Sequence, residues 1–220
     1  MGIKERRERE RIRRNNDIVD AAERVIFGKG PDYATMEDIA KEAELGKATI
    51  YGYYKSKDEL LLAINERALN KLASLFREAH AVGSNGMEKV REIGRAYIRF
   101  SHEYPNYYHF ISLFEMGNMN IDPIKSMENA LGCDKILEGA IELGMQDKSI
   151  RDDMSPAVLS KMLWGMSTGM IQLLKNRGQV MQELNGIKEE DMYEHFFRMV
   201  DTALNPLAKS LESKYTFKTD

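Results

Sequence analysis

The sequence predicts an all-α fold, and three observations support this class. Apolar residues recur at helical spacing along almost the whole chain. No stretch shows the sustained alternation of apolar and polar residues, bounded by turns, that is typical of a strand. Glycine-rich sequences at residues 28–31 and 83–86 interrupt the helical pattern. With 220 residues, 43% of them hydrophobic, the chain can bury a sizeable core.

The expected helices differ in length and in the residues that begin them. The candidate N-caps are Thr35, Ser56, Asp122 and Ser155. Asp38 and Glu59 follow the first two caps by three residues, the spacing of a capping box. Proline stands in the first turn of three helices, at Pro105, Pro123 and Pro156. The helices are expected near residues 9–27, 36–44, 47–53, 56–80, 87–103, 106–116, 123–146, 156–176 and 188–211.

Basic residues gather at the start of the chain, although the net charge of the whole is −3. Residues 1–14 hold seven basic side chains against three acidic ones, a local charge of +4 that leaves −7 for the remainder. Such a segment can bind an anionic partner, or it can be a solvated and partly disordered tail. The charge pattern alone favours neither interpretation.

Features of export, of metal binding and of redox chemistry are missing from the sequence. No run approaches the roughly eighteen apolar residues that span a bilayer. The opening residues are charged where a signal peptide needs an apolar segment. The single cysteine, Cys133, has no second thiol for a disulfide or a zinc site, so we expect a buried, inert thiol rather than a redox sensor. We therefore expect a cytoplasmic protein with no cofactor, no metal and no membrane contact.

Two short helices joined by a turn of three or four residues follow the first long helix. This arrangement matches a helix-turn-helix, whose second helix enters the major groove of DNA, although many helical proteins contain such a corner. The second short helix is unusually polar and aromatic for a core helix: it carries Lys47, Thr49, Tyr51, Tyr53 and Tyr54. Tyrosine hydroxyls and lysines suit phosphate oxygens, and threonine can contact a base edge.

The same region resembles the N-terminal signature of the TetR family of transcriptional regulators. The resemblance begins with Thr35-Met36-Glu37-Asp38-Ile39-Ala40 at the start of the second helix. It continues with Lys47-Ala48-Thr49-Ile50-Tyr51-Gly52-Tyr53-Tyr54-Lys55-Ser56-Lys57-Asp58-Glu59-Leu60-Leu61. The match covers about fifty residues without a gap, and the rest of the chain carries no comparable motif.

The resemblance implies two domains and a set of DNA contacts. Residues 1–57 would form a DNA-binding domain with a basic N-terminal arm, and residues 58–220 a larger helical ligand-binding and dimerisation domain. Backbone phosphates would be bound by Thr35, Lys47, Tyr51, Tyr53 and Lys57, and the bases faced by Ala48, Thr49 and Gly52. Ile50 and Tyr54 are expected to pack inside. An arm before the first helix, with Arg9 and Arg11, could follow the backbone or enter the minor groove.

The turn between the two short helices departs from the family pattern. The family commonly has a glycine, a small apolar residue and a serine there, whereas this chain has Glu44, Leu45 and Gly46. Glycine is an acceptable N-cap, so the recognition helix should still form, but a hydroxyl that could bind DNA is missing. Glu44 places a carboxylate close to a polyanion and can weaken binding unless it is turned away or paired with a lysine.

Beyond the helix-turn-helix, aromatic and methionine side chains suggest an adaptable apolar pocket, with ordinary core packing as the alternative. The candidate pocket residues are Tyr107, Phe110, Phe114, Met127, Met162, Trp164, Met166 and Met170. Two late helices are candidates for a four-helix dimer interface, with packing inside one chain as the alternative. The candidate interface residues are Gly165, Gly169, Phe196, Met199, Val200 and Ala203.

The predicted function is that of a homodimeric transcription regulator, and the resemblance favours a repressor. It would bind a palindromic double-stranded operator and be released by a largely apolar small-molecule effector. An enzyme is the first rival, but the four histidines lack metal-like or triad-like spacing, and the pairs His102 with Glu103 and His109 with Glu115 are weak candidates. A helical protein-binding module is the second rival, and it leaves the recognition-helix tyrosines unexplained.

Overall fold

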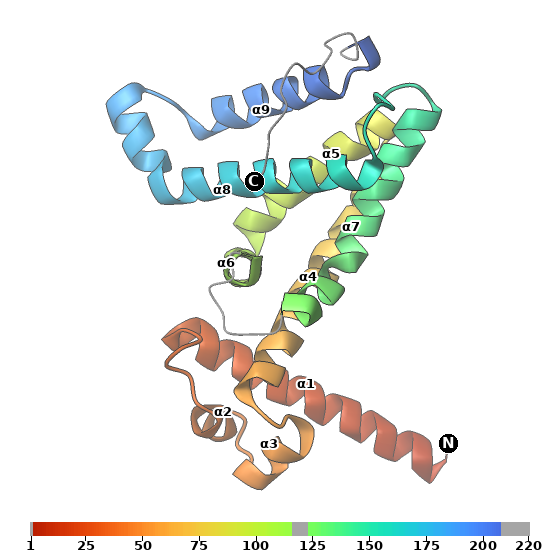
Figure 1. Cartoon of the computed structure of the whole chain (residues 1–220). Helices are drawn as coiled ribbons and strands as arrows, with labels where there is room; N and C mark the ends of the chain where they lie inside the picture. The colour runs from red at the N-terminus through yellow and green to blue at the C-terminus, as the bar shows by residue number, and fades with distance from the viewer. Residues whose placement is uncertain (1, 116–122, 208–220) are drawn as a thin grey trace, which may run out of the picture. The chain divides into compact units, whose positions relative to one another are not determined.

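The computed structural model describes the backbone of residues 2–115 and 123–207 and the side chains of residues 2–114 and 132–207. No strand occurs within these residues, which confirms the predicted all-α class (Figure 1). The helices are α1 (Ile3–Lys29), α2 (Met36–Glu42), α3 (Lys47–Tyr53), α4 (Lys57–Val82), α5 (Gly86–Glu103), α6 (Pro105–Glu115), α7 (Pro123–Gln146), α8 (Pro156–Asn185) and α9 (Glu189–Leu204). None of the described helices is long and apolar enough to cross a membrane.

The chain forms two compact units, and their boundary falls inside a helix. Unit 1 comprises Met1–Asn70 and Asn106–Ala130, and unit 2 comprises Lys71–Pro105 and Leu131–Asp220. This division differs from the expected boundary at residue 57, because the first half of α4 and all but the first residue of α6 belong to unit 1. The helix-turn-helix of unit 1 therefore carries additional helical support.

The core of unit 1 fixes the helix-turn-helix. Ile18 of α1, Ile39 of α2 and Ile50 of α3 have no exposed surface and pack in one apolar cluster. Phe110 of α6 joins this cluster and meets the ring of Phe27 edge to face, with 5.8 Å between the ring centroids. Each short helix is thus held by its own buried apolar residues, which leaves its other faces for contacts outside the core.

A polar cluster also connects α1, α4 and α6 inside unit 1. The guanidinium of Arg67 lies 2.5 Å from a carboxylate oxygen of Asp20 and 3.2 Å from one of Glu23. The hydroxyl of Tyr107 donates a hydrogen bond to Glu23 at 2.9 Å. Burial, followed by the bond to Glu23, raises the pKa of Tyr107 to about 12, so the phenol stays protonated at neutral pH.

The predicted helix starts are confirmed where capping side chains defined them. The hydroxyl oxygen of Thr35 accepts a hydrogen bond from the backbone N–H of Asp38, and the Asp38 carboxylate accepts one from the N–H of Thr35. Ser56 accepts a bond from the N–H of Glu59 at 3.3 Å, and Ser155 accepts one from the N–H of Val158. These caps satisfy amide groups that have no partner within the helix. The candidate cap Asp122 lies outside the described residues.

Three helix ends differ from the prediction: the start of α1, the end of α8 and the end of α9. Helix α1 begins at Ile3 rather than near Arg9, so the basic segment is a helix and not an arm that precedes one. Arginine and glutamate are good helix formers, and ion pairs at helical spacing stabilise the first turns of α1. Helix α8 continues to Asn185, and α9 ends at Leu204 instead of residue 211.

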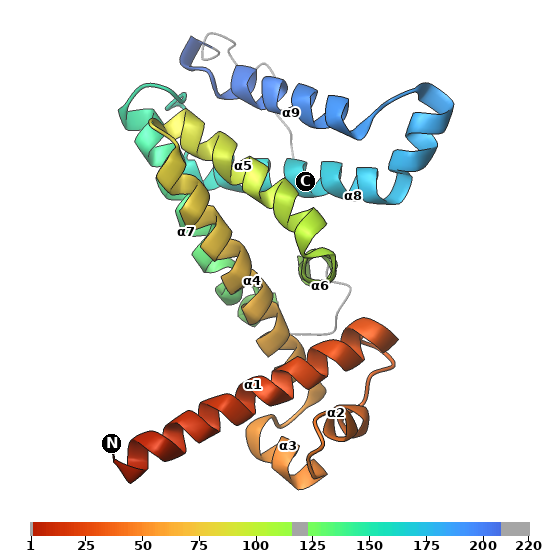
Figure 2. The ribbon, with the colours of Figure 1, turned by 180° about the vertical axis from the view of Figure 1, so that it is seen from behind.

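Unit 2 is built by close contact between helices. A Cβ atom on Gly86, at the start of α5, would lie 2.0 Å from the backbone nitrogen of Gly144 in α7. The backbone N–H of Gly86 donates to Asp147, and that of Met87 donates to Ser149. Helices α8 and α9 run antiparallel, and α5 packs against α8 (Figure 2). The close approach of α5 to α7 at Gly86 requires a residue without a side chain.

Candidate DNA interface and effector cavity

Helix α3 presents a contiguous outer face. Its buried side chain is Ile50, and its N-cap Gly46 has an extended backbone conformation with no capping side chain. The residues predicted to meet DNA lie on the exposed or half-exposed side of the helix: Lys47, Ala48, Thr49, Tyr51, Gly52 and Tyr53. Lys47, Ala48, Tyr51 and Gly52 are therefore exposed to solvent, whereas Thr49 and Tyr53 are half-exposed, and Tyr53 packs partly against the core of unit 1.

Three of the predicted phosphate-binding residues, Lys57, Thr35 and Lys47, already have partners within the chain. The Lys57 ammonium donates to the backbone carbonyl of Pro31 at 2.8 Å and so fastens the loop before α2. Thr35 belongs to the capping box of α2. Lys47 forms an exposed ion pair with Glu37 of α2, at 2.8 Å. A phosphate at Lys47 would thus replace or join a carboxylate that is exposed to solvent and weakly held.

The turn between α2 and α3 carries backbone strain. Glu44 has a φ of 54°, the left-handed conformation that glycine adopts without cost. The backbone N–H of Leu45 donates to the carbonyl of Ala40 at 3.0 Å, which closes the turn at the end of α2. Glu44 thus occupies the position where the resembled family has glycine, and it keeps the backbone conformation of that residue.

The basic half of α1 shares a surface hollow with the recognition helix. Arg7, Arg11, Arg13 and Arg14 line this hollow together with Tyr53 of α3, and two acidic side chains also reach it. Arg11 pairs with Glu8 at 2.9 Å, and Arg9 donates to the backbone carbonyl of Glu5. Within the described residues, Arg7, Arg13 and Arg14 form no ion pair. A helical row of cations therefore lies beside the predicted DNA contacts.

One exposed aromatic residue of unit 1 does not stand out in the sequence. Tyr33 lies in the turn before α2 and is 81% exposed, compared with 45% for Tyr51 of α3. A single exposed tyrosine is common on protein surfaces, so this exposure alone assigns no contact to Tyr33. The only signal for it in the sequence is its place two residues before the Thr35 cap.

An apolar cavity lies within unit 2. Its walls come from α4, α5, α7, α8 and α9 and include Phe76, Leu137, Trp164 and Phe197. The ring of Trp164 stacks on Tyr97 at 4.8 Å, and the Tyr97 hydroxyl is 2.9 Å from that of Thr168. The cavity volume is about 40 Å³. Ligand pockets usually measure roughly 300–1,000 Å³, so a small-molecule effector has to widen this space.

The candidate pocket residues do not all line this cavity. Trp164 does, whereas Tyr107, Phe110 and Phe114 belong to unit 1, where the last two pack in its core. Met162 and Met166 are exposed on α8, Met170 is buried, and the side chain of Met127 lies outside the described residues. Aromatic and methionine content alone could not separate core, cavity and surface, because all three use the same residue types.

The candidate dimer residues also divide into two groups. Gly165 and Gly169 are exposed on α8, and Met199 and Ala203 are exposed on α9. Phe196 and Val200 instead line the cavity. The exposed apolar side chains of α8 and α9 are Val158, Met162, Met166, Leu173, Val180, Leu184 and Met199. This concentration is unusual for the free surface of a monomer.

Only one of the two alternative acid–base pairs lies within the described side chains. His102 lies 3.2 Å from Glu189 and 3.3 Å from the hydroxyl of Tyr193, both on α9, so its partners differ from the proposed Glu103. The side chain of Glu115, the proposed partner of His109, lies outside the described residues. Within residues 2–114 and 132–207, no three histidine, cysteine or acidic side chains form a group that could bind a metal ion. Cys133 is buried, as expected.

A family model decides the identity of the N-terminal region. The model described as "Bacterial regulatory proteins, tetR family" matches residues 18–64, which include α2, α3 and the residues that carry the resemblance. Residues 18–64 therefore carry the N-terminal segment of the TetR family. The helix-turn-helix of unit 1 is thus the DNA-binding element of this family, and the resemblance seen in the sequence is confirmed.

Curated relatives of the chain are transcriptional regulators. The HTH-type transcriptional activator FasR of Mycolicibacterium smegmatis is 30% identical over 41% of this chain and 41% of its own length. The fatty acid metabolism regulator protein of Bacillus subtilis is 23% identical over 67% of this chain and 76% of its own length. The chain thus spans about two-fifths of the first relative and three-quarters of the second.

Solved structures share the fold over most of the chain. FadR from Bacillus subtilis, solved in complex with stearoyl-CoA, superposes with a TM-score of 0.67 at 20% identity, over 85% of this chain and 95% of its own. A TetR-family regulator from Marinobacter aquaeolei superposes with a TM-score of 0.65 at 21% identity, over 89% and 98%. The likeness includes the helices that follow the family-model match.

Proposed function

We propose that this chain is a homodimeric, ligand-responsive transcription regulator that binds double-stranded operator DNA through α3. The observation that carries this proposal is the outer face of α3, where Lys47, Tyr51 and Gly52 are exposed around the buried anchor Ile50. Lysine and tyrosine suit the phosphates, while the small residues Ala48 and Gly52 allow the helix close to the base edges.

The basic half of α1 adds a second DNA contact in this proposal. The hollow that joins Tyr53 to Arg11 and Arg14 places guanidinium groups beside the recognition helix. Guanidinium groups bind phosphate oxygens with two parallel hydrogen bonds. Because the segment is helical, Arg11 is presented to the phosphate backbone on a rigid element. Arg9 lies on another face of α1, so in this proposal it reaches a different phosphate.

The proposed dimer uses the exposed faces of α8 and α9. Gly165 and Gly169 are four residues apart on α8, and a Cβ atom on either would meet nothing within 4 Å in the single chain. A partner helix can therefore approach closely there, while Met199 and Ala203 extend the surface on α9. Two recognition helices at about 34–36 Å fit successive major grooves of a palindromic operator.

The proposed effector is a long-chain acyl compound that enters the cavity of unit 2 and releases the repressor from its operator. The cavity is lined almost wholly by apolar side chains, and the similar FadR structure holds stearoyl-CoA. Because binding must widen the cavity, the liganded and unliganded proteins differ in conformation. Effector and DNA then oppose each other reciprocally.

Selection of binding sites from random duplex DNA tests the proposal. We expect a palindromic consensus, and we expect Tyr51→Phe, which removes only a hydroxyl, to weaken binding by about fivefold for each half-site, the effect of removing one hydrogen bond of ~1 kcal/mol from each subunit. Lys47→Ala should also lower the salt dependence of log affinity by about 0.9 for each phosphate that the variant no longer neutralises. Lys135→Ala, an exposed lysine on α7, is the matched control.

Two outcomes would contradict the proposal. Equal and weak DNA affinity for the wild type and the α3 variants would favour a protein-binding module. A selected consensus whose affinity does not respond to long-chain acyl compounds would leave the DNA-binding role intact and remove the proposed effector.

A further inference from the structure

The cavity of unit 2 contains one charged residue among the described residues that line it, Arg91 of α5. Arg91 also lines an adjacent polar hollow that includes Asn85, Ser149 and Asp201. The side chain thus stands at the border between an apolar chamber and a polar opening. Amphipathic ligands require this combination of surroundings.

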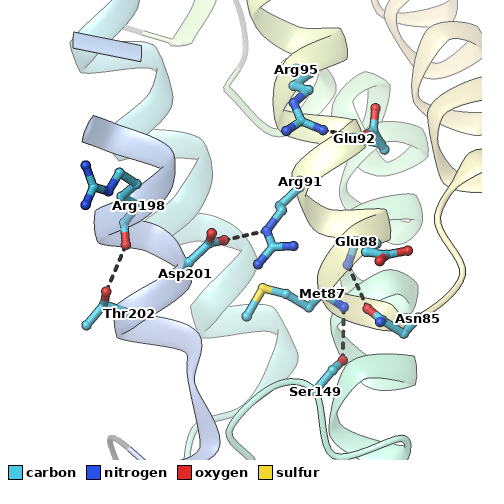
Figure 3. A network of polar contacts seen from close by, with 10 residues as sticks. All are labelled: Asn85, Met87, Glu88, Arg91, Glu92, Arg95, Ser149, Arg198, Asp201 and Thr202. Carbon is cyan, nitrogen blue, oxygen red and sulfur yellow. Dashed lines mark hydrogen bonds and ion pairs between the residues drawn. The ribbon is translucent and has the colours of Figure 1, made fainter. Parts of the chain in front are cut away.

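The present partner of Arg91 is a carboxylate from another helix. Its Nε donates to Asp201 of α9 at 2.7 Å, and the two side chains are each about one-third exposed, at 34% and 32% (Figure 3). The terminal nitrogens of the guanidinium have no hydrogen-bond partner within the described residues. A partly exposed ion pair adds little to stability, so an incoming anion can replace it at small cost.

The helix that supplies Asp201 also supplies a wall of the cavity. Phe196, Phe197 and Val200 of α9 line the apolar chamber, and Asp201 follows Val200 directly. A Cβ atom on Gly94 of α5 would lie 2.9 Å from the ring of Phe197, so α5 and α9 are in close contact at this wall. An acyl tail that widens the chamber at this wall displaces the same segment of α9 that Asp201 holds.

We propose that Arg91 binds the anionic head group of the effector in exchange for Asp201, while the apolar tail occupies the chamber beside Trp164. This assignment rests on the proposed acyl effector and specifies its chemistry: a single-chain amphiphile whose head group carries a carboxylate or a phosphate. A guanidinium binds either anion with paired hydrogen bonds. Exchange of the Arg91 partner frees α9 from α5, and α9 carries part of the proposed dimer surface.

Trp164 provides the readout, since it is the single tryptophan of the chain and lines the cavity. The full-length protein is titrated with palmitate, palmitoyl-CoA and the neutral hexadecanol, below their micelle concentrations, while Trp164 fluorescence is recorded. We expect Arg91→Met to weaken binding of both anions by about 10- to 100-fold relative to hexadecanol. Asp201→Asn should strengthen binding of the anions several-fold, because it removes the competing carboxylate.

Two further variants control the experiment. Arg91→Lys keeps the charge but not the paired hydrogen bonds, and it should give an intermediate loss. Arg99→Met changes an exposed arginine of α5 that does not line the cavity, and it should leave all three titrations unchanged. Circular dichroism of each variant identifies any that fails to fold.

The outcomes separate this inference from the effector proposal. If palmitate alone depends on Arg91, the head group is a carboxylate; if palmitoyl-CoA alone does, it is a phosphate. If folded Arg91→Met and Arg91→Lys bind all three amphiphiles as the wild type does, the head-group assignment is overturned and the acyl effector stands. If the wild type binds none of them, both proposals fail.

Discussion

The DNA-reading region of α2 and α3 and the cavity region of α4, α5, α7, α8 and α9 are both helical, but they are specified in different ways. The first is a contiguous segment whose capping residues, turn and buried Ile50 lie within residues 35–59. The walls of the second come from residues as far apart as Phe76 and Val200. Local sequence determines the first region, whereas packing between distant segments determines the second.

The forces that hold the two regions differ accordingly. Around the helix-turn-helix, exposed ion pairs such as Lys29 with Asp38 and Arg24 with Glu42 surround a small apolar core. In unit 2 the backbones of α5 and α7 touch at Gly86 and Gly144. A larger side chain at this contact should therefore destabilise unit 2 far more than a larger side chain on the recognition helix, because two close-packed backbones cannot move apart without loss of packing.

The largest expected effect comes from two glycine substitutions, one in each of the two regions. Gly86→Ala places a Cβ atom 2.0 Å from the backbone of Gly144 and should destabilise unit 2 by about 3 kcal/mol or more. In Gly52→Ala the new Cβ meets nothing within 4 Å, so stability should be unchanged or raised by up to ~1 kcal/mol. Urea unfolding followed by Trp164 fluorescence and circular dichroism measures both.

The same two variants, Gly86→Ala and Gly52→Ala, separate effects on stability from effects on DNA binding. Gly52→Ala should weaken operator binding despite its intact fold, since the methyl group stands on the face proposed to enter the groove. Wild-type stability in Gly86→Ala, or wild-type DNA affinity in Gly52→Ala, would contradict the contrast between the regions.

The features that could be predicted from the sequence lie mostly in segments fixed by neighbouring residues, and the features that could not lie where distant segments pack together. The family, the two short helices, the caps at Thr35, Ser56 and Ser155 and the burial of Ile50 were predictable, because each depends on residues a few positions apart. The predicted start of α1 was wrong because apolar periodicity begins late in it, while glutamate–arginine pairs carry the helix back to Ile3.

The cavity could not be assembled from the sequence. Phe196 and Val200 share one helix with Met199 and Ala203, yet the first two face the cavity and the others are exposed. One amphipathic pattern cannot tell an inner wall from an outer apolar face, since both are hydrophobic. The role of Arg91 was equally hidden, because its partner Asp201 lies on another helix, far along the chain.

A smaller effect is expected at the turn that departs from the family pattern. Glu44→Gly relieves the left-handed conformation and should stabilise unit 1 by on the order of 0.5–1 kcal/mol, after the entropy cost of glycine is subtracted. Removal of the carboxylate should also raise DNA affinity, by up to about fivefold for a ~1 kcal/mol repulsion. Thermal unfolding and fluorescence anisotropy with operator DNA measure the two effects.

Glu44→Gln divides these two contributions. It removes the charge but keeps a side chain at a φ of 54°, so it should raise DNA affinity without raising stability. If Glu44→Gly and Glu44→Gln were equally stable, the turn would store no strain. If both variants bound DNA with the affinity of the wild type, Glu44 would lie away from the operator.

The smallest expected effect concerns the pH dependence of the α2 cap. The hydrogen bond from Lys29, followed by that from Thr35, lowers the pKa of Asp38 from 3.8 to about 2. A carboxylate whose pKa is depressed by folding stabilises the native state above its unfolded pKa, and this contribution is lost as the pH falls from about 4 to about 2. The difference in melting temperature between wild type and Asp38→Asn should therefore shrink across this window.

Lys29→Met provides the control for this pH effect, because it removes the largest cause of the depressed pKa. NMR titration of the Asp38 carboxyl should show its pKa returning part of the way toward 3.8 in Lys29→Met, with the Thr35 bonds accounting for the remaining shift. A pKa that does not change would mean that the cap alone stabilises the carboxylate, and the cross-helix pair would add nothing to the DNA-reading region. Either result shows how far that region depends on contacts beyond its own short segment.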